Sequence, residues 1–150
     1  MLFRSLTSHP ADDVVPSWSR NGDWIYFSSK RTGDWQVWKM AADGNRPPER
    51  VTRQGGFAPQ ESPDGRFIYY AKGLNVPGIW KISEADGEET GVLTQGREGF
   101  WGYWAVTENG IYFLNTEAVP SPAIEFLDLD RKSTRLNSSH SQQSRMPSSA

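Results

Sequence analysis

The residues that could do chemistry are few, and they do not form a catalytic set. The only histidine ahead of a serine-rich C-terminal tail is His9, in a predicted loop. A nucleophilic triad needs a base, usually histidine, within reach of a serine, but the chain has no Gly-x-Ser-x-Gly sequence. The chain also has no cysteine, which excludes thiolate nucleophiles, disulfides and cysteine-based zinc sites. We therefore expect no catalytic residue in this chain.

Metal and phosphate sites are not predicted either. One histidine cannot build a histidine-based metal centre. Asp12 and Asp13 are adjacent carboxylates, but the alternating Asp/Asn pattern of a calcium loop does not follow them. We expect Asp13 to bond backbone donors at the start of a strand. Glycines occur singly apart from Gly55-Gly56, and no Gly-Lys-Ser/Thr sequence follows them. We expect no metal and no cofactor.

The composition limits the class of protein further. The 150 residues include 16 Lys plus Arg and 18 Asp plus Glu, a formal charge of −2. That balance gives no basic face for nucleic acid or an anionic membrane. No apolar run approaches the roughly 18 residues of a membrane span, and no signal-peptide-like apolar stretch opens the chain. Aromatic residues are abundant, with 7 Trp, 5 Tyr and 7 Phe.

The chain repeats itself every 43 residues. The triplet that begins at Ile25 recurs at Ile68 and again at Ile111, each time shortly after an Asn-Gly or Asp-Gly turn. The sequence Val37-Trp38-Lys39-Met40 is matched by Ile79-Trp80-Lys81-Ile82. A period of 40–45 residues is typical of propeller blades. Trp18 and Trp104 lie two periods apart, with Glu61 midway.

Each repeat is predicted to be a series of β-strands joined by tight turns. Asn-Gly and Asp-Gly favour hairpins because both turn positions need a positive φ, and the flanking runs are rich in β-branched and aromatic residues. We predict strands at 14–19, 23–29, 35–40 and 49–53; at 57–61, 66–72, 77–82 and 89–94; at 100–106, 110–114 and 123–129; and a strand of an earlier repeat at 2–7. No helix is predicted. We expect most Trp residues to pack between blades, with Trp35 and Trp101, near predicted loops, as the exceptions.

The C-terminal segment differs from the rest. Residues 131–150 contain seven serines, four basic residues and no acid, a composition typical of disorder. The run from Asp130 to His140 resembles one translated frame of a sequencing-library adapter. We therefore interpret residues 130–150 as a non-native, disordered tail and exclude them from the fold. The preceding 129 residues have 12 basic and 17 acidic side chains, a charge of −5.

The first repeat resembles the TolB-like propeller repeat. The resemblance rests on Asp13, Pro16-Ser17-Trp18-Ser19, Asn21-Gly22, Arg31 with Gly33, and Asp43-Gly44. The second repeat has Ser62-Pro63-Asp64-Gly65 but Glu61 at the tryptophan position, and the third matches least well. The resemblance implies a six-bladed, WD-like β-propeller. It covers residues 1 to about 129 and suggests a periplasmic location.

The predicted fold class is therefore all-β, a partial β-propeller of about three four-stranded antiparallel blades. We expect residues 1–15 to be the last strand of a preceding blade plus a loop. Residues 16–56 and 57–99 are expected to be blades, and 100–129 an incomplete blade. Six blades need about twice the residues available, so we expect the chain to be a fragment of a larger ring.

The expected function is a non-catalytic repeat scaffold that binds a protein or a small-molecule ligand at one axial face. We expect no direct contact with nucleic acid. The candidate binding residues are those placed in loops at that face: Asp12, Asp13, Arg31, Asp34, Phe57, Arg97 and Trp101. Two alternatives stay open because fold does not determine function. The propeller could precede the catalytic domain of a prolyl-oligopeptidase-type serine peptidase, or it could be the sensor of a winged-helix transcriptional regulator.

Overall fold

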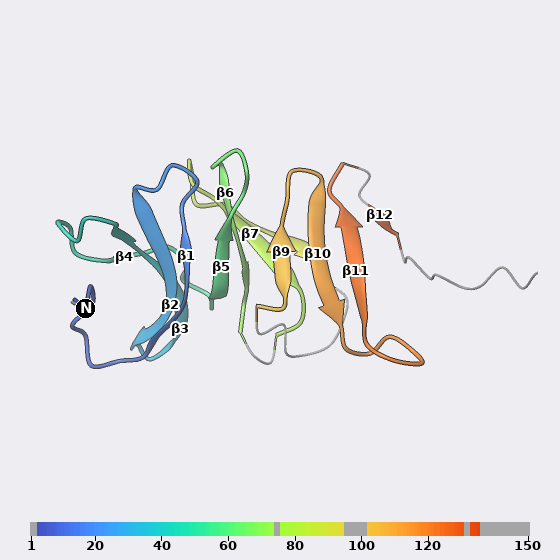
Figure 1. Ribbon diagram of the computed structural model, residues 1–150, viewed down its shortest axis with the longest axis horizontal. Coiled ribbons are helices and arrows are strands. Elements are labelled where there is room, and N and C mark those ends of the chain that lie inside the picture. The colour runs from blue at the N-terminus through green and yellow to red at the C-terminus, as the bar shows by residue number, and fades with distance from the viewer. Residues whose placement is uncertain (1–2, 74–75, 95–101, 131–132, 136–150) are drawn as a thin grey trace, which may run out of the picture.

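The structure is a row of three antiparallel sheets with no helix among the residues described (Figure 1). It is a computed structural model that describes residues 3–73, 76–94, 102–130 and, for the backbone, 133–135. Each sheet has four strands, ordered as they follow in the sequence. The all-β prediction and the three-blade architecture are confirmed.

The strands of each sheet are contributed by one repeat. The first sheet contains β1 (Asp13–Trp18), β2 (Trp24–Thr32), β3 (Asp34–Ala41) and β4 (Glu49–Arg50). The second contains β5 (Phe57–Glu61), β6 (Phe67–Ala71), β7 (Ile79–Ser83) and β8 (Glu89–Leu93). The third contains β9 (Trp104–Val106), β10 (Gly110–Asn115), β11 (Ala123–Asp128) and β12 (Ser133–Arg135). We refer to the three sheets as blades 1, 2 and 3.

Two sequence predictions are wrong at the ends of the chain. Residues 3–12 contain no strand, where we expected one over 2–7, because no neighbouring strand offers its backbone groups for pairing. Blade 3, expected to be incomplete, has a fourth strand, Ser133–Arg135, paired with β11. That strand falls inside the tail that we expected to be disordered. An open sheet edge accepts any extended segment, because pairing uses backbone groups.

The first strands of blades 1 and 2 contain a shared irregularity. In β1 the register shifts between Val14 and Ser17, and in β5 it shifts between Phe57 and Gln60. At each shift a residue before a proline has φ of 51°, Val15 in blade 1 and Ala58 in blade 2. Such bulges bend a strand and increase its twist. A Cβ added to Gly102 would lie 3.2 Å from the Ala58 Cβ and 3.8 Å from Val15 Cγ1, so the segment just before β9 lies close to the bulges of β1 and β5.

The hydrophobic cores lie between neighbouring blades, where the face of one blade packs against the facing side of the next. Between blades 1 and 2, Tyr26 and Val37 pack with Ile68, Tyr70 and Ile82. Between blades 2 and 3 the equivalent contacts include those of Tyr69, Ile79, Trp104, Ile111 and Phe113. All of these side chains are at most 6% exposed. Stacking neighbouring blades thus supplies the burial that a single sheet cannot supply for itself.

The turn into blade 2 depends on a glycine with a close neighbour. Gly55 has φ of +91°, and a Cβ added there would lie 2.2 Å from the carbonyl oxygen of Lys72. Gly22, in the turn between β1 and β2, has φ of +78° but nothing within 4 Å of an added Cβ. Substitution of the two glycines therefore distinguishes the cost of a side chain at positive φ from the added cost of a steric clash with neighbouring backbone.

We predict that Gly55→Ala lowers the free energy of unfolding by about 3 kcal/mol or more, because it adds a backbone clash to the unfavourable φ. Gly22→Ala should lose only about 1–2 kcal/mol, the effect of the left-handed backbone alone. Urea denaturation followed by tryptophan fluorescence measures both. Equal losses in the two variants would contradict the close packing around Gly55.

Candidate binding face at one end of the blades

Three kinds of loop meet at one end of the blades, which we call the axial rim. Strands β1 and β5 begin there, β2 ends there and β3 begins there, since paired strands run in opposite directions. The loop after β10 reaches the same end of blade 3 (Figure 1). The predicted binding residues Asp12, Asp13, Arg31, Asp34 and Phe57 all come from these segments. Arg97 and Trp101 lie outside the described residues.

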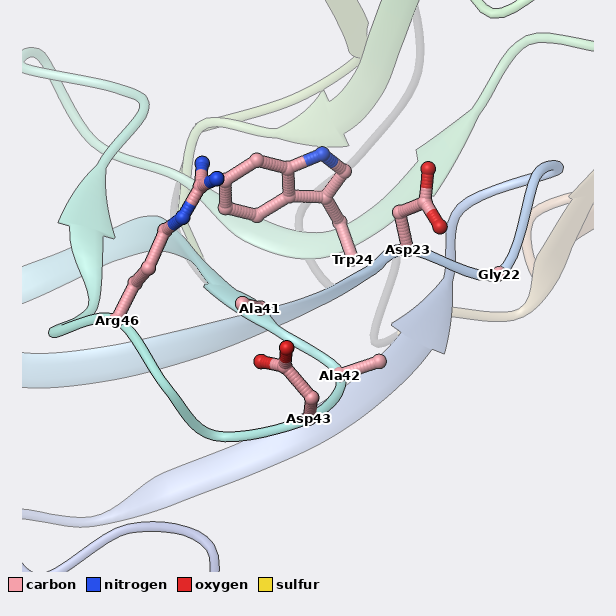
Figure 2. A pocket seen from close by; sticks show the side chains of 7 residues that line it. All are labelled: Gly22, Asp23, Trp24, Ala41, Ala42, Asp43 and Arg46. Carbon is pink, nitrogen blue, oxygen red and sulfur yellow. The ribbon is translucent and has the colours of Figure 1, made fainter.

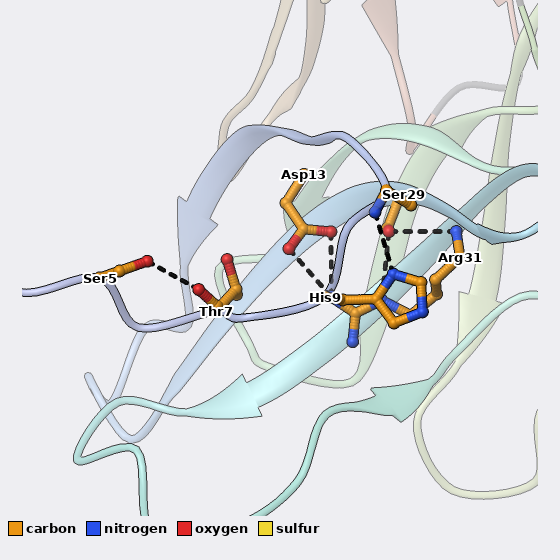
Figure 3. Close-up of polar contacts among 7 residues, drawn as sticks. Ser5, Thr7, His9, Asp13, Ser29 and Arg31 are labelled. Carbon is orange, nitrogen blue, oxygen red and sulfur yellow. Dashed lines mark hydrogen bonds and ion pairs between the residues drawn. The ribbon is translucent and has the colours of Figure 1, made fainter.

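Asp13 and Arg31 form a clamp across blade 1 at the axial rim (Figure 3). One terminal nitrogen of Arg31, Nη2, lies 3.0 Å from each carboxylate oxygen of Asp13, and Nε donates to Ser29 Oγ at 3.1 Å. The guanidinium also lies over the rings of Phe27 and Trp38, 5.1 and 4.9 Å from their centroids. Only 9% of the Arg31 side chain and 14% of the Asp13 side chain are exposed.

The environment of Asp13 favours its charged form. Burial alone would raise the pKa of Asp13, but hydrogen bonds with Ser29, Arg31 and Thr7 and the positive charge of Arg31 lower it below its usual value. Both charged groups are therefore already paired within blade 1. The ion pair links the start of β1 to the end of β2, so the two residues position the axial rim. Little of either side chain is exposed for contact with a partner.

His9 lies in the segment that leads to this clamp (Figure 3). Its Nδ1 accepts a hydrogen bond from the backbone N–H of Ala11 at 3.1 Å. Ser5 stabilises the same segment by donating from Oγ to the Thr7 carbonyl at 2.6 Å. These contacts give His9 a structural role in the approach to β1.

Trp35 and Phe57 join blade 1 to blade 2 at the axial rim. Their rings meet edge to face with centroids 5.3 Å apart, and Lys30 Nζ lies 4.9 Å from the Trp35 centroid. Phe57 is only 2% exposed, so it contributes to the core rather than to an open surface. Trp35, which we expected to be an exception to blade packing, is half-buried against that core. Among the tryptophans that the structure describes, the exposed one is Trp18, at 63%.

Asp12 and Asp34 are the two predicted residues that the fold leaves free. Both are exposed, and within the described part of the chain neither forms an ion pair or a side-chain hydrogen bond. Asp34 is next to Trp35, whose ring carries the exposed Lys30. The axial rim of blade 1 thus presents two unpaired carboxylates, a cation and part of an indole ring.

The sequence analysis missed a second clamp, in blade 2. Lys72 Nζ lies 2.7 Å from Glu89 Oε2 and 4.3 Å from the ring centroid of Trp80. Trp80 corresponds to Trp38 in the repeat, so both blades place a cation against the same tryptophan. The matched Val37-Trp38 and Ile79-Trp80 pairs could have indicated this arrangement, but the acidic partner comes from a different strand in each blade.

A polar network between blades 1 and 2 was also missed. The Tyr26 hydroxyl oxygen lies 3.2 Å from both Glu61 Oε1 and Glu84 Oε1, which share its one proton, and Glu84 pairs with Lys39 at 3.3 Å. The backbone N–H of Arg20 also donates to Glu61. Burial and the charges of Glu84 and Glu61 raise the pKa of Tyr26, so it stays a neutral donor. Glu61, which stands where the other two repeats have tryptophan, is therefore held by hydrogen bonds from blade 1.

A cavity of about 520 Å³ lies at the opposite end of blade 1, lined by Asp23, Trp24, Asp43 and Arg46 (Figure 2). Trp24 there has two cations nearby, Lys39 Nζ at 4.9 Å and Arg46 Cζ at 5.7 Å from its centroid. Blade 2 repeats this arrangement with Phe67, which has Lys81 at 4.2 Å and Arg66 at 5.8 Å. The recurrence indicates that aromatic and cationic side chains pack together at this end of blades 1 and 2 as part of the fold.

The described residues contain neither a cluster of metal-ligating side chains nor a membrane-spanning helix. No group of three or more His, Cys, Asp or Glu side chains in that part of the chain could hold a metal ion. No helix there is long and apolar enough to cross a membrane. The arrangement at the axial rim can therefore contribute charge, hydrogen-bond acceptors and an aromatic surface.

The model of the TolB beta propeller domain matches residues 2–150 of the chain. The chain belongs to this family. An uncharacterized protein of Agrobacterium fabrum, Atu1656, is 44% identical over 67 residues, which are 43% of this chain and 22% of that protein. The structure of TolB from Acinetobacter baumannii is similar with a TM-score of 0.70 and 16% identity, over 86% of this chain and 33% of TolB. A putative TolB from Agrobacterium tumefaciens gives a TM-score of 0.54 and 28% identity, over 63% of this chain and 37% of that one.

These comparisons place the TolB-like repeat among bacterial proteins. The chain spans between about a fifth and about two fifths of the length of these relatives. The adapter resemblance of residues 130–140 stays a prediction.

We predict that Asp13→Asn lowers the free energy of unfolding at pH 7 by about 1–3 kcal/mol, because it leaves the Arg31 guanidinium without its charged partner. The folded pKa of Asp13 is lowered, so its contribution is fully present above the unfolded value of about 3.9 and is lost as the pH falls through the lower folded value. The difference between wild type and variant should therefore shrink below pH 4. Urea denaturation at pH 7 and pH 3 measures it, and a difference independent of pH would contradict this role.

Proposed function

We propose that this TolB propeller chain is a non-catalytic scaffold that binds a protein partner through its axial rim. The observation that carries the proposal is that Asp12 and Asp34 are exposed and unpaired at the axial rim, with Asp34 next in sequence to Trp35, whose ring lies against Lys30. Isolated surface charges are common, but Asp34 adjoins an aromatic side chain, and both carboxylates lie on segments that a rigid sheet positions. Rigid scaffolds with variable loops are a usual way to present a binding surface.

The chemistry of the rim favours a partner with basic groups. Asp13, the third carboxylate, is already neutralised by Arg31, so Asp12 and Asp34 supply the free negative charge. Trp35 adds an aromatic edge, a residue type enriched in protein interfaces. A protein segment with Lys or Arg beside an apolar side chain would complement this surface. A small ligand at the same rim is the alternative within the binding class.

In the peptidase and regulator alternatives, the catalytic domain or the DNA-binding domain would lie in another segment of a longer protein. In either case the present residues would act as a binding or gating propeller. The complete gene distinguishes them: a downstream Gly-x-Ser-x-Gly with later Asp and His supports the peptidase, and an upstream basic helix-turn-helix supports the regulator. We also propose a periplasmic location, on the family resemblance. Fusion to a reporter that is active in only one compartment tests it.

A photo-crosslinking amino acid at Asp34 in bacterial cells should capture a specific partner, whereas the same probe at Asp43, at the opposite end of blade 1, should not. With that partner purified, the double variant Asp12→Lys and Asp34→Lys should weaken binding at least about tenfold. Asp43→Lys is the matched control and should leave Kd unchanged. Binding that tolerates the double variant, or is equally sensitive to Asp43→Lys, would overturn the proposal.

A further inference from the structure

Blades 1 and 2 meet in a polar network at the end of the blades opposite the axial rim. The Tyr26 hydroxyl and the Lys39 ammonium come from paired positions on β2 and β3. Both contact the Glu84 carboxylate of blade 2, at 3.2 and 3.3 Å. Glu61, also from blade 2, lies 3.2 Å from the same hydroxyl. Blade 2 thus supplies two acidic side chains to one hydroxyl donor and one cation of blade 1.

Blades 2 and 3 meet with the same two donors. Tyr69 pairs with Lys81 across β6 and β7, as Tyr26 pairs with Lys39 across β2 and β3. Tyr69 is buried like Tyr26, with 4% and 1% of the two residues exposed. Lys81 Nζ lies 4.2 Å from the centroid of the Phe67 ring, so packing holds the ammonium at this interface. The hydroxyl and the cation of blade 2 therefore come from the same positions as those of blade 1.

Blade 3 has aliphatic side chains at the positions of the two acids. The pairing of β9 with β10 places Val106 where Glu61 stands in blade 2. The turn after β9 is shorter than the turn after β5, so Trp104, the match in the sequence repeat, lies earlier in the strand. The pairing of β10 with β11 likewise places Leu129 where Glu84 stands. At this interface the donors of blade 2 therefore face no equivalent carboxylate.

A cavity of about 620 Å³ lies at this place between blades 2 and 3. Its lining includes Phe67, Tyr69, Lys81, Val106 and Leu129. Within the part of the chain that the structure describes, Lys81 forms no ion pair and the Tyr69 hydroxyl no hydrogen bond. The cavity has the volume of a small-molecule site. It combines an apolar wall with a hydroxyl donor and a cation that the described residues do not use.

The acidic side chains around the cavity limit the charge of a ligand. Asp64 is paired with Arg66 at 2.6 Å, and hydrogen bonds from Ser62 and Arg66 lower its pKa to about 2. Glu108 and Asp130 also line the cavity and are exposed. A second or third negative charge on a ligand would meet these carboxylates and be repelled. A ligand with one carboxylate and an apolar portion therefore fits better than a dicarboxylate.

We propose that this cavity binds a small monocarboxylic acid, whose carboxylate accepts from Tyr69, pairs with Lys81 and takes the place that Glu84 has in the neighbouring interface. The apolar portion of the acid packs against Phe67 and Leu129. Hydrogen bonds to a charged group are stronger than neutral ones, and the buried position of the tyrosine strengthens them further. The cavity lies at the opposite end of the blades from the axial rim, so this site is separate from the proposed protein-binding surface.

Titration calorimetry of the 150-residue chain with phenylacetate and with hexanoate tests the site. At least one of the two acids should bind saturably. Phenylacetamide, the uncharged counterpart, should bind at least about tenfold more weakly than phenylacetate or not at all, because it lacks the charge that Lys81 recognises.

Substitutions of the two donors test the residues that hold the carboxylate. Lys81→Met and Tyr69→Phe should each weaken binding of the acid at least about tenfold, because each removes one contact with a charged group. Lys39→Met is the matched control: it removes the equivalent cation of blade 1, which already pairs with Glu84, and should leave Kd unchanged.

Leu129→Glu gives the sharpest test, because it supplies the carboxylate that blade 3 lacks. The new side chain should pair with Tyr69 and Lys81 and abolish binding of the acid, whereas Leu129→Met, of similar size and uncharged, should retain it. Circular dichroism shows that each variant is folded.

Four results would overturn the proposal. They are no saturable binding of either acid by wild type, equal affinity for phenylacetate and its amide, binding that survives Lys81→Met or Leu129→Glu, and equal sensitivity to Lys39→Met. The first two are measured on the wild-type chain and do not depend on the folding of any variant.

Discussion

The structure depends on one constraint: a blade has two apolar faces, and the neighbouring blades supply most of their cover. Tyr26 and Val37 on one side of blade 1 are almost fully buried, whereas Trp18 on the other side is 63% exposed. Burying a large apolar side chain contributes about 1.5–3 kcal/mol, so each added blade stabilises the one before it. Stability in such an array comes from nearest-neighbour interfaces more than from any single repeat.

The polar contacts of the interior follow from the same constraint. Glu61 occupies the position that tryptophan fills in the other two repeats, and a buried carboxylate is costly unless it is hydrogen-bonded. Tyr26 and the backbone N–H of Arg20 donate to it. Blade 3 has Trp104 at this position, packed in an apolar cluster with Tyr69. One repeat position therefore accepts a carboxylate or an indole, because the neighbouring blade supplies hydrogen-bond donors to Glu61 and apolar contacts to Trp104.

The repeat, the turns and most strand positions could be predicted from the sequence, because they depend on local turn chemistry and periodicity. The clamps could not be predicted in full. The Asp13–Arg31 pair joins two residues of one motif, but Lys72 pairs with Glu89 on β8, a contact that depends on strand register. Phe57 was predicted as a binding residue in a loop, whereas its ring is buried in a core that includes contact with the Trp35 ring of another blade. Residues that make such contacts across strands and blades have no constant separation in the sequence, so a sequence pattern does not reveal them.

Comparison of the repeats separates residues that build the rim from residues that could recognise a partner. Positions that agree in type, such as Trp38 and Trp80 with a cation against each ring, are committed to the fold. Asp34 precedes Val37 by three residues, as Val76 precedes Ile79, so an exposed acid in one blade is matched by an apolar residue in the next. A packing role would restrict both positions in the same way. Because the fold makes no such demand here, the side chain at this position is available for binding.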